Sequence, residues 1–361
     1  MTLVAASLLA FLSSLILSLL IVLTQSVHGR FTLDGHLGVQ KVHRHPTPRV
    51  GGLTLAGGCV AGGLVLPIEA AAFSTALYAA AMPAFLSGLM EDLTKRVGAA
   101  LRLLATIIAG GIFVQATGYA ITEVDLPLAD QLLAIPGFAF LFTAFAIGGI
   151  ANAINIVDGV NGLAAGTAVI VLAAFGLIAG AVGDATILAA CVVGLSALCG
   201  FMALNFPGGR LFMGDAGAYG TGFALAAIAV ALPQRNAEVS PLIGLLLLAY
   251  PVAETMVSIR RRMVRDGAHP GQPDRLHLHS LVYRSQARRL ADLLSRPHLR
   301  NPLTAVLIWW LPLLSAGLAL LTWRNSGLVL TAVTVVTVGY LLHYRRVALL
   351  RRGGILRDAT A

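Results

Sequence analysis

Long apolar segments dominate this chain of 361 residues. A helix needs about 20 mostly apolar residues to cross a bilayer, and lipid admits such segments as helices because they satisfy their own backbone hydrogen bonds. The glycine-rich second candidate, which contains Pro67, fits this length least well. We predict an all-α, polytopic integral membrane protein with about 11 transmembrane helices, at roughly 3–27, 51–69, 71–90, 101–120, 132–151, 162–182, 185–204, 216–233, 239–259, 303–322 and 326–344.

The composition agrees with a membrane protein, since 57% of the residues are apolar and only 11% are charged. The first segment has no basic residue before it and exceeds the roughly 7–15 apolar residues of a signal-peptide core, so we expect it to be retained as a helix. Cys59, Cys191 and Cys199 lie within apolar segments without CxxC spacing, which argues against a disulfide framework or a zinc site. We predict one membrane domain over residues 1–361.

The basic residues predict the orientation of the chain. If the N-terminus lies outside, all but two of the 25 Lys and Arg residues fall on the inner side. The two exceptions are Arg235 and Arg324. The outer loop after the fourth segment carries Glu123, Asp125 and Asp130 and no basic residue. By the positive-inside rule the N-terminus is periplasmic. The net charge of +9 therefore indicates orientation and not nucleic-acid binding.

This orientation makes the long loop at about 260–302 and the basic tail at 345–361 cytoplasmic. Within the loop, RSQARRLADLLSRPHLR (residues 284–300) places leucines beside arginines. That pattern suits a helix in the lipid headgroup plane, and it equally suits a solvated basic connector. The sequence leaves both interpretations open.

Five polar groups lie at the predicted cytoplasmic side, among them the run NAINIVDGVNGLAAG at 152–166. Each alone has an ordinary explanation as a helix end, a turn or a solvated loop. Their convergence on one membrane face indicates a shared site. The groups are Lys41, His43, Arg44, His45 and Arg49; Glu91 and Asp92; Asn152, Asn155, Asp158 and Asn161; Asn205, Arg210 and Asp215; and Asp274, Arg275, His277 and His279.

These residue types suit a metal and phosphates together. Carboxylate and amide oxygens are ligands of Mg²⁺ or Mn²⁺, which substrate phosphates usually complete. Arginines, histidines and glycine-exposed N–H groups bind the phosphates themselves. Phosphoryl transfer needs both sets because it depends on positioning and charge neutralisation. We therefore predict a metal-dependent phosphoryl-transfer site at the inner membrane surface.

The motifs HPTPRVGG, EDLTKR, NAINIVDGVNGLAAG, LFMGDAG and PDRLHLHS occur in this order along the chain. At these residues the chain resembles the polyprenyl-phosphate N-acetylhexosamine-1-phosphate transferases, the glycosyltransferase family that includes the peptidoglycan translocase. The PDRxHxH form resembles the branch that uses a simple UDP-amino sugar. The resemblance implies a multi-pass enzyme of the bacterial inner membrane. It would transfer a phospho-N-acetylhexosamine from a UDP-sugar to undecaprenyl phosphate, release UMP and start a lipid-linked envelope glycan such as an O-antigen or capsule.

The resemblance also implies roles for individual residues. Asp215, with Asp158, would hold Mg²⁺, or Mn²⁺ in its place. Asp92 would act at the acceptor phosphate, where direct attack by the lipid phosphate is favoured over a covalent intermediate on Asp92 itself. Phe212 would stack on uracil. The other implied roles are those of Glu91, Asp158, His277 and His279 in catalysis and of Arg49, Asn152, Asn155, Asn161, Asn205 and Arg275 in substrate binding.

The chain departs from the family pattern at four positions. Glu91 and Glu254 stand where aspartates are usual, Asn161 where a second acid often follows, and Ser280 where a further histidine is common. Two other functions stay open: a secondary transporter, which would place ionisable groups near the bilayer midplane in repeated halves, and a non-catalytic polyprenyl-lipid-binding membrane protein. The sequence does not specify the amino sugar, the glycan pathway or whether the protein is a homodimer.

Overall fold

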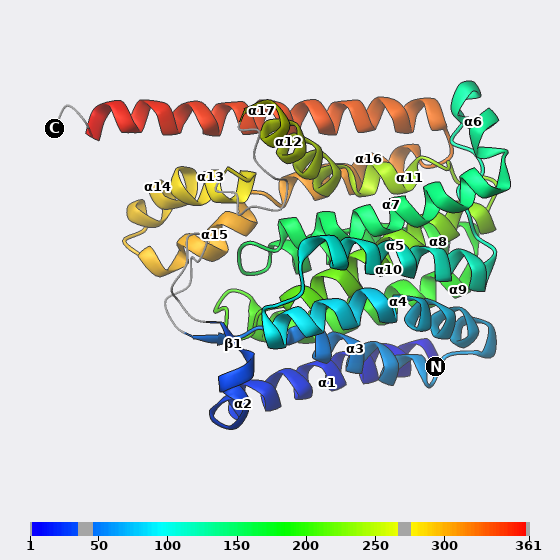
Figure 1. Cartoon of the computed structure of the whole chain (residues 1–361), viewed down its shortest axis with the longest axis horizontal. Helices are drawn as coiled ribbons and strands as arrows, with labels where there is room; N and C mark the ends of the chain where they lie inside the picture. The colour runs from blue at the N-terminus through cyan, green and yellow to red at the C-terminus, as the bar shows by residue number, and fades with distance from the viewer. Residues whose placement is uncertain (1, 35–45, 266–275, 359–361) are drawn as a thin grey trace.

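The computed structural model describes residues 2–34, 46–265 and 276–358 and shows a helical bundle with one very short sheet (Figure 1). The sheet pairs β1 (Leu33–Asp34) with β2 (Thr47–Pro48) in antiparallel fashion. The helices of the first half are α1 (Thr2–Leu23), α2 (Gln25–Thr32), α3 (Gly51–Gly63), α4 (Ile68–Thr94), α5 (Ala99–Thr117), α6 (Pro127–Leu133), α7 (Pro136–Val157) and α8 (Leu163–Val182). Those of the second half are α9 (Ala185–Asn205), α10 (Gly214–Arg235), α11 (Ile243–Leu247), α12 (Ala249–Arg265), α13 (Leu278–Arg284), α14 (Gln286–Leu293), η1 (Pro297–Leu299), α15 (Arg300–Val306), α16 (Trp310–Thr322) and α17 (Ser326–Asp358).

Within these described ranges, nine helical segments are long and apolar enough to cross a membrane. They correspond to nine of the eleven segments expected from the sequence, and they confirm a polytopic, all-helical membrane protein. They are α1, α4, α5, α7, α8, α9 and α10, the run Pro297–Thr322, and Ser326–Leu349 of α17.

The remaining two expected segments differ from the prediction. The segment at 51–69 forms α3, whose 13 residues rise only about 20 Å, well short of the roughly 30 Å of a hydrocarbon core. The segment at 239–259 is divided at Leu248 into α11 and α12, and α12 continues into a run of arginines. A glycine-rich composition and a helix break thus account for the difference from about 11 spans.

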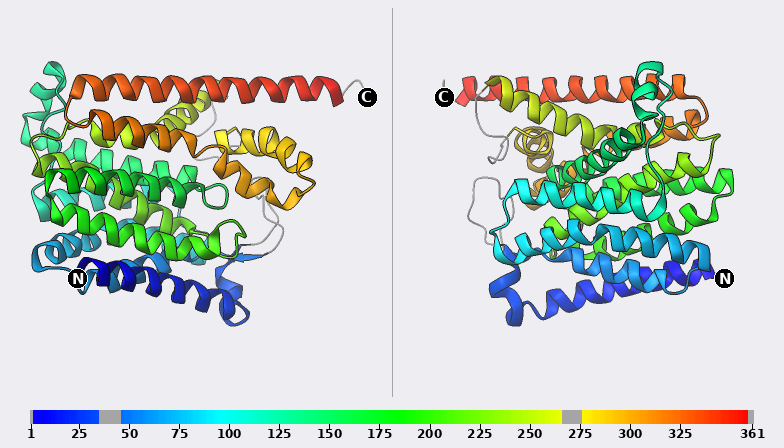
Figure 2. Two further views of the ribbon diagram at one scale, coloured as in Figure 1. Left: turned by 180° about the vertical axis from the view of Figure 1, so that it is seen from behind. Right: turned by 45° about the vertical axis from the view of Figure 1, so that its right-hand side comes forward.

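Helix α10 lies in the middle of the bundle, between the α1 and α3 edge and the α16 and α17 edge (Figures 1 and 2). It packs against α3, α4, α7 and α8 and is the most buried of the nine spanning segments. Small residues permit the close approach: a Cβ atom at Gly52 would lie 2.4 Å from the Gly217 nitrogen, and one at Gly222 would lie 2.8 Å from Ala151 Cα. The first residues of α10 are therefore fixed by several neighbouring helices.

A partly buried ion pair lies at the C-terminal end of α10. Arg235 Nε donates to Asp184 Oδ2 at 2.7 Å, and Asp184 also accepts the N–H groups of Thr186 and Ile187 at the start of α9. Burial raises the pKa of Asp184, but the hydrogen bonds from Arg235, Asn236 and the Ile187 N–H, with the Arg235 charge, hold it below its usual value. The pair gives Arg235, one of the two basic residues predicted outside, a structural role.

Candidate active site

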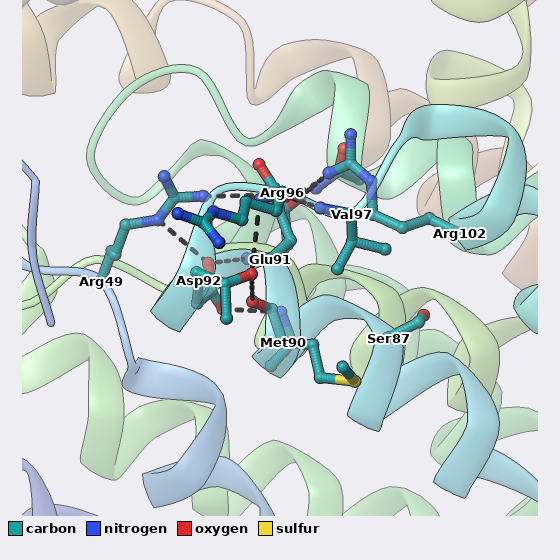
Figure 3. Close-up of polar contacts among 12 residues, drawn as sticks. Arg49, Ser87, Met90, Glu91, Asp92, Arg96, Val97 and Arg102 are labelled. Atoms are coloured by element: carbon teal, nitrogen blue, oxygen red, sulfur yellow. Dashed lines mark hydrogen bonds and ion pairs between the residues drawn. The ribbon is translucent and has the colours of Figure 1, made fainter. Parts of the chain in front are cut away.

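Asp92 fastens the end of α4 to the beginning of α10 (Figure 3). Its carboxylate is fully buried and accepts the Asp215 N–H at 2.9 Å and the Ala216 N–H at 3.0 Å. These are the donors that a helix leaves unsatisfied in its first turn, so Asp92 caps α10 from another helix. Arg49 Nε donates to the same carboxylate at 3.0 Å. The acidic motif and the MGD motif therefore form one unit.

The HPTPRVGG and LFMGDAG motifs run side by side through their backbones. The Phe212 N–H donates to the Pro48 carbonyl at 2.8 Å, and the Gly51 and Gly52 N–H groups donate to the carbonyls of Phe212 and Met213 at 2.9 and 2.8 Å. These contacts place Arg49 directly beside the MGD turn. Phe212 itself is half-buried there.

Gly214 is required at this turn for two reasons. Its φ of +72° lies in the left-handed region, and a Cβ atom would lie 2.0 Å from the Arg49 carbonyl oxygen and 2.6 Å from Asp92 Oδ2. Gly88 gives α4 the same close approach, since its Cβ would lie 2.6 Å from the Asp215 carbonyl carbon. Glycine thus brings three backbones against one buried carboxylate.

The Asp215 carboxylate is surrounded by cationic and amide donors. Arg49 Nη2 lies 3.5 Å from Oδ1, Asn155 Nδ2 donates to Oδ1 at 3.2 Å, and Arg102 Nη1 pairs with Oδ2. Figure 3 shows Arg102 reaching in from α5, opposite Arg49. Arg102 was not predicted as a site residue. The signal that could have identified it is a lone arginine one turn into an apolar segment.

Asp158 follows α7 and belongs to the same electrostatic cluster. Burial and the charge of Asp92 raise the pKa of Asp158 to about 7, although Arg49 opposes the shift. The residue is half-buried at the turn after Val157. A cation bound beside this carboxyl group would favour its ionised form.

The remaining predicted asparagines bond to other parts of the protein. Asn152 Nδ2 donates to Thr106 Oγ1 and to the Gly148 carbonyl, both at 2.8 Å, and so joins α7 to α5. Asn205 Oδ1 accepts the Gly162 N–H while its Nδ2 donates to the Leu211 carbonyl, each at 2.8 Å. In this arrangement both amides position neighbouring segments.

Asn161 and Glu91 also have partners within the protein. The Asn161 N–H donates to Asn301 Oδ1 at 2.8 Å, which ties the NxxNxxDG turn to α15. Asn301 was not predicted. Glu91 Oε2 accepts the Val97 N–H at 2.8 Å, so its carboxylate stabilises the connection between α4 and α5 (Figure 3).

The histidine loop lies against the turn that carries Asp158. The rings of His277 and His279 are parallel, with centroids 5.5 Å apart and an interplanar angle of 8°. His279 covers Gly159 so closely that a Cβ atom there would lie 2.2 Å from Nε2. Burial, with the neighbouring His277 charge, lowers the pKa of His279 to about 4, although Glu254 opposes this. Arg275, also predicted, lies outside the described residues, as do Lys41, His43, Arg44, His45 and Asp274.

The described residues include no group of three or more His, Cys, Asp or Glu side chains arranged to hold a metal ion. The oxygen donors still fit Mg²⁺, which binds proteins through one or two carboxylates and completes its shell with waters and substrate phosphates. The Asp215 carboxylate accepts a hydrogen bond from the Asn155 amide, and the Asp158 carboxyl group feels the charges of Asp92 and Arg49. The arginines around Asp215 mark the same region as one that binds anions.

The chain matches one family profile and several named relatives. The profile of "Glycosyl transferase family 4" matches residues 74–233, which include Asp92, Asp158 and Asp215. The chain is 30% identical over 241 residues to a probable undecaprenyl-phosphate N-acetylglucosaminyl 1-phosphate transferase of Bacillus subtilis (strain 168), covering 66% of each chain. It is 30% identical over 260 residues, 68% of each chain, to the undecaprenyl-phosphate alpha-N-acetylglucosaminyl 1-phosphate transferase of Escherichia coli O157:H7. The chain therefore belongs to glycosyl transferase family 4, among the polyprenyl-phosphate N-acetylhexosamine-1-phosphate transferases.

Proposed function

We propose that this protein transfers a phospho-N-acetylhexosamine from a UDP-sugar to undecaprenyl phosphate at the cytoplasmic face of the bacterial inner membrane. An oxygen of the lipid phosphate forms a bond to the sugar-linked phosphorus. The bond from that phosphorus to the bridging oxygen breaks, and UMP leaves with its electron pair. The observation that carries the proposal is the cluster of Asp92, Asp215, Arg49 and Arg102 at one end of the spanning helices.

In this proposal the acidic residues bind the metal ion and the basic residues bind the phosphates. Asp215, with Asp158, would hold Mg²⁺ or Mn²⁺, which neutralises the diphosphate of the donor when bound. Arg49 and Arg102 lie where they would hold phosphate oxygens once the metal competes for Asp215. His277, His279 and Arg275 would complete this anion site from the cytoplasmic loop.

Direct attack by the lipid phosphate fits the burial of Asp92 better than a covalent intermediate does. Both oxygens of Asp92 already accept hydrogen bonds, and the residue is fully buried. A phosphate monoester is largely dianionic at neutral pH and needs no strong base. Asp92 would then act at the acceptor phosphate indirectly, because it holds Arg49 in place.

The grouping of the acids favours a transferase over a secondary transporter. A secondary transporter would place its ionisable groups near the bilayer midplane, whereas these acids lie at helix ends. The names of the relatives support N-acetylglucosamine as the first sugar to test, and the start of an O-antigen-like or capsule glycan as the pathway. The proposal includes a homodimer as the oligomeric state to be tested.

The test is a transfer assay with the purified full chain in detergent. Undecaprenyl phosphate is incubated with labelled UDP-GlcNAc or UDP-GalNAc, with Mg²⁺ or with EDTA. We expect equal amounts of UMP and lipid-linked sugar diphosphate, only when Mg²⁺ is present. Polyprenyl-phosphate binding without UMP release would instead support the non-catalytic alternative, and sugar-nucleotide uptake into vesicles without UMP release would support a transporter.

A further inference from the structure

Glu254 is a buried carboxylate on which three helices meet, and the proposed reaction gives it no role. It is 0% exposed and lies in α12. His277 Nδ1 lies 2.9 Å from Oε1, the Leu278 N–H lies 3.2 Å from each oxygen, and the Tyr340 hydroxyl of α17 donates to Oε2 at 2.9 Å. The start of α13 and the middle of α17 are thus joined through one side chain.

The number of donors indicates that this carboxylate is ionised. A buried charge costs several kcal/mol unless hydrogen bonds satisfy its oxygens, and here three groups supply them. An ionised carboxylate can only accept hydrogen bonds, so the hydrogen between it and His277 must reside on Nδ1. Glu254 therefore keeps a hydrogen on Nδ1 of His277 and fixes the direction in which this nitrogen points.

The same contact sets the plane of the His277 ring. His279 stacks parallel to it, and His279 in turn covers Gly159 beside Asp158. A change in the angle of the His277 ring would therefore displace His279 and, with it, the contact to the turn that carries Asp158. Contacts run without interruption from Tyr340 through Glu254 and the two histidines to that turn.

We propose that Glu254 and Tyr340 are positioning residues of this active site. Glu254 holds the His277 ring through its protonated Nδ1 and so fixes the orientation of the ring, and Tyr340 fixes the carboxylate of Glu254. The proposal rests on the transfer reaction proposed above. It assigns a role in the chemistry to α17, the last helix of the chain, which carries none of the sequence motifs.

A matched control at Tyr344 distinguishes the proposed positioning role of Tyr340 from a purely structural role. Tyr344 lies one turn further along α17 and stacks on Tyr340, with ring centroids 6.1 Å apart. Its hydroxyl donates to the Leu276 carbonyl at 3.1 Å, just before His277, and accepts from Arg261 at 2.7 Å. Both Tyr340→Phe and Tyr344→Phe remove one hydroxyl that tethers this loop, but only the first touches Glu254.

The experiment compares Glu254→Gln, Glu254→Asp, Tyr340→Phe and Tyr344→Phe with the parent as purified full chains. We expect kcat/KM to fall about 10- to 100-fold in Glu254→Gln, the range found when partners that orient a ligating histidine are removed. Glu254→Asp should recover part of this loss because it keeps the charge. Tyr340→Phe should lose roughly fivefold to tenfold, as for one hydrogen bond, and Tyr344→Phe less than about twofold.

The second readout is ¹⁵N NMR of histidine-labelled protein, with His277→Gln used to assign the His277 signals. The parent should show a protonated Nδ1 at His277, and Glu254→Gln should show a mixture of tautomers. An unchanged tautomer in Glu254→Gln, or equal losses in Tyr340→Phe and Tyr344→Phe, would overturn the proposal. If the parent itself transfers no sugar phosphate, the proposed function fails, while the NMR comparison still decides the positioning role.

Discussion

The carboxylate of Asp92 accepts hydrogen bonds from the backbone N–H groups of Asp215 and Ala216, at 2.9 and 3.0 Å. The acid of one motif thereby fixes the backbone of the acid in another, and Arg49 contacts both side chains. Substitutions at these positions should therefore change charge and geometry together.

Asp92→Asn should reduce transfer at least about 100-fold. The amide keeps the size of the side chain, but its NH₂ group would face the α10 N–H groups or Arg49, so a buried donor loses its acceptor. The melting temperature should fall as well. The measurements are transfer rate and thermal unfolding of the purified variant.

The same variant separates direct attack from a covalent route. The parent, freed of lipid, should not exchange labelled UMP into UDP-sugar, because Asp92 is fully buried and both its oxygens are engaged. Robust exchange without lipid that disappears in Asp92→Asn would establish the covalent route instead.

Asp215→Asn should lower activity by at least about two orders of magnitude, the scale of a lost electrostatic contact in a transition state. It should also raise the Mg²⁺ concentration that gives half-maximal activity. Asp292→Asn is the control, since this exposed acid pairs only loosely with Arg288 at 3.8 Å. Near-normal turnover of Asp215→Asn with unchanged Mg²⁺ dependence would remove Asp215 from the metal site.

Gly159→Ala should slow transfer roughly tenfold or more, because the added methyl group would lie 2.2 Å from His279 Nε2 and push the histidine loop away. Gly149→Ala is the matched control in α7, where an added methyl group meets nothing within 4 Å. Kinetics of both variants against the parent test the contact. Equal rates would mean that His279 does not need to lie on this turn.

Asp184 predicts a pH dependence of stability. Because its pKa in the folded protein is lowered, its contribution is complete above its unfolded pKa of about 4 and is lost as the pH falls through the folded value. Asp184→Asn should lower the melting temperature at pH 7 by at least about 3 °C, since Arg235 loses its partner. As the pH falls below about 5, the melting temperature of the variant should decrease less than that of the parent. Parallel curves for the two proteins would contradict the assignment.

The orientation inferred from the basic residues is tested by labelling single cysteines in a chain without its three native ones. Glu123→Cys, in the acidic loop, should react with an impermeant reagent from outside. Leu293→Cys, which is 81% exposed in α14, should react only from inside. Labelling of both from one side would refute the predicted topology.

Sequence patterns predicted the spanning helices because hydropathy and length suffice for that, and they predicted the gathering of Arg49, Asp92, Asn155 and Asp215. The sequence could not show that Arg102 would complete the cluster, since its contact depends on how α5 packs on α10. Tertiary contacts likewise determine the hydrogen-bond partners of several other side chains. Those of Asn152, Asn205 and Glu91 bond to protein groups, and Asn301 and Tyr340 gained contacts that no local motif indicates.

The hydrogen bond between Asp92 and Asp215 joins residues 123 positions apart. At roughly 5–20 residues per second, a ribosome needs about 6 to 25 s to synthesise that interval, so α4 enters the membrane long before α10 exists. Until α10 is present, the Asp92 carboxylate lacks the backbone N–H groups that it caps in the folded protein. The contacts that bury and satisfy Asp92 therefore become complete only after α10 has been synthesised.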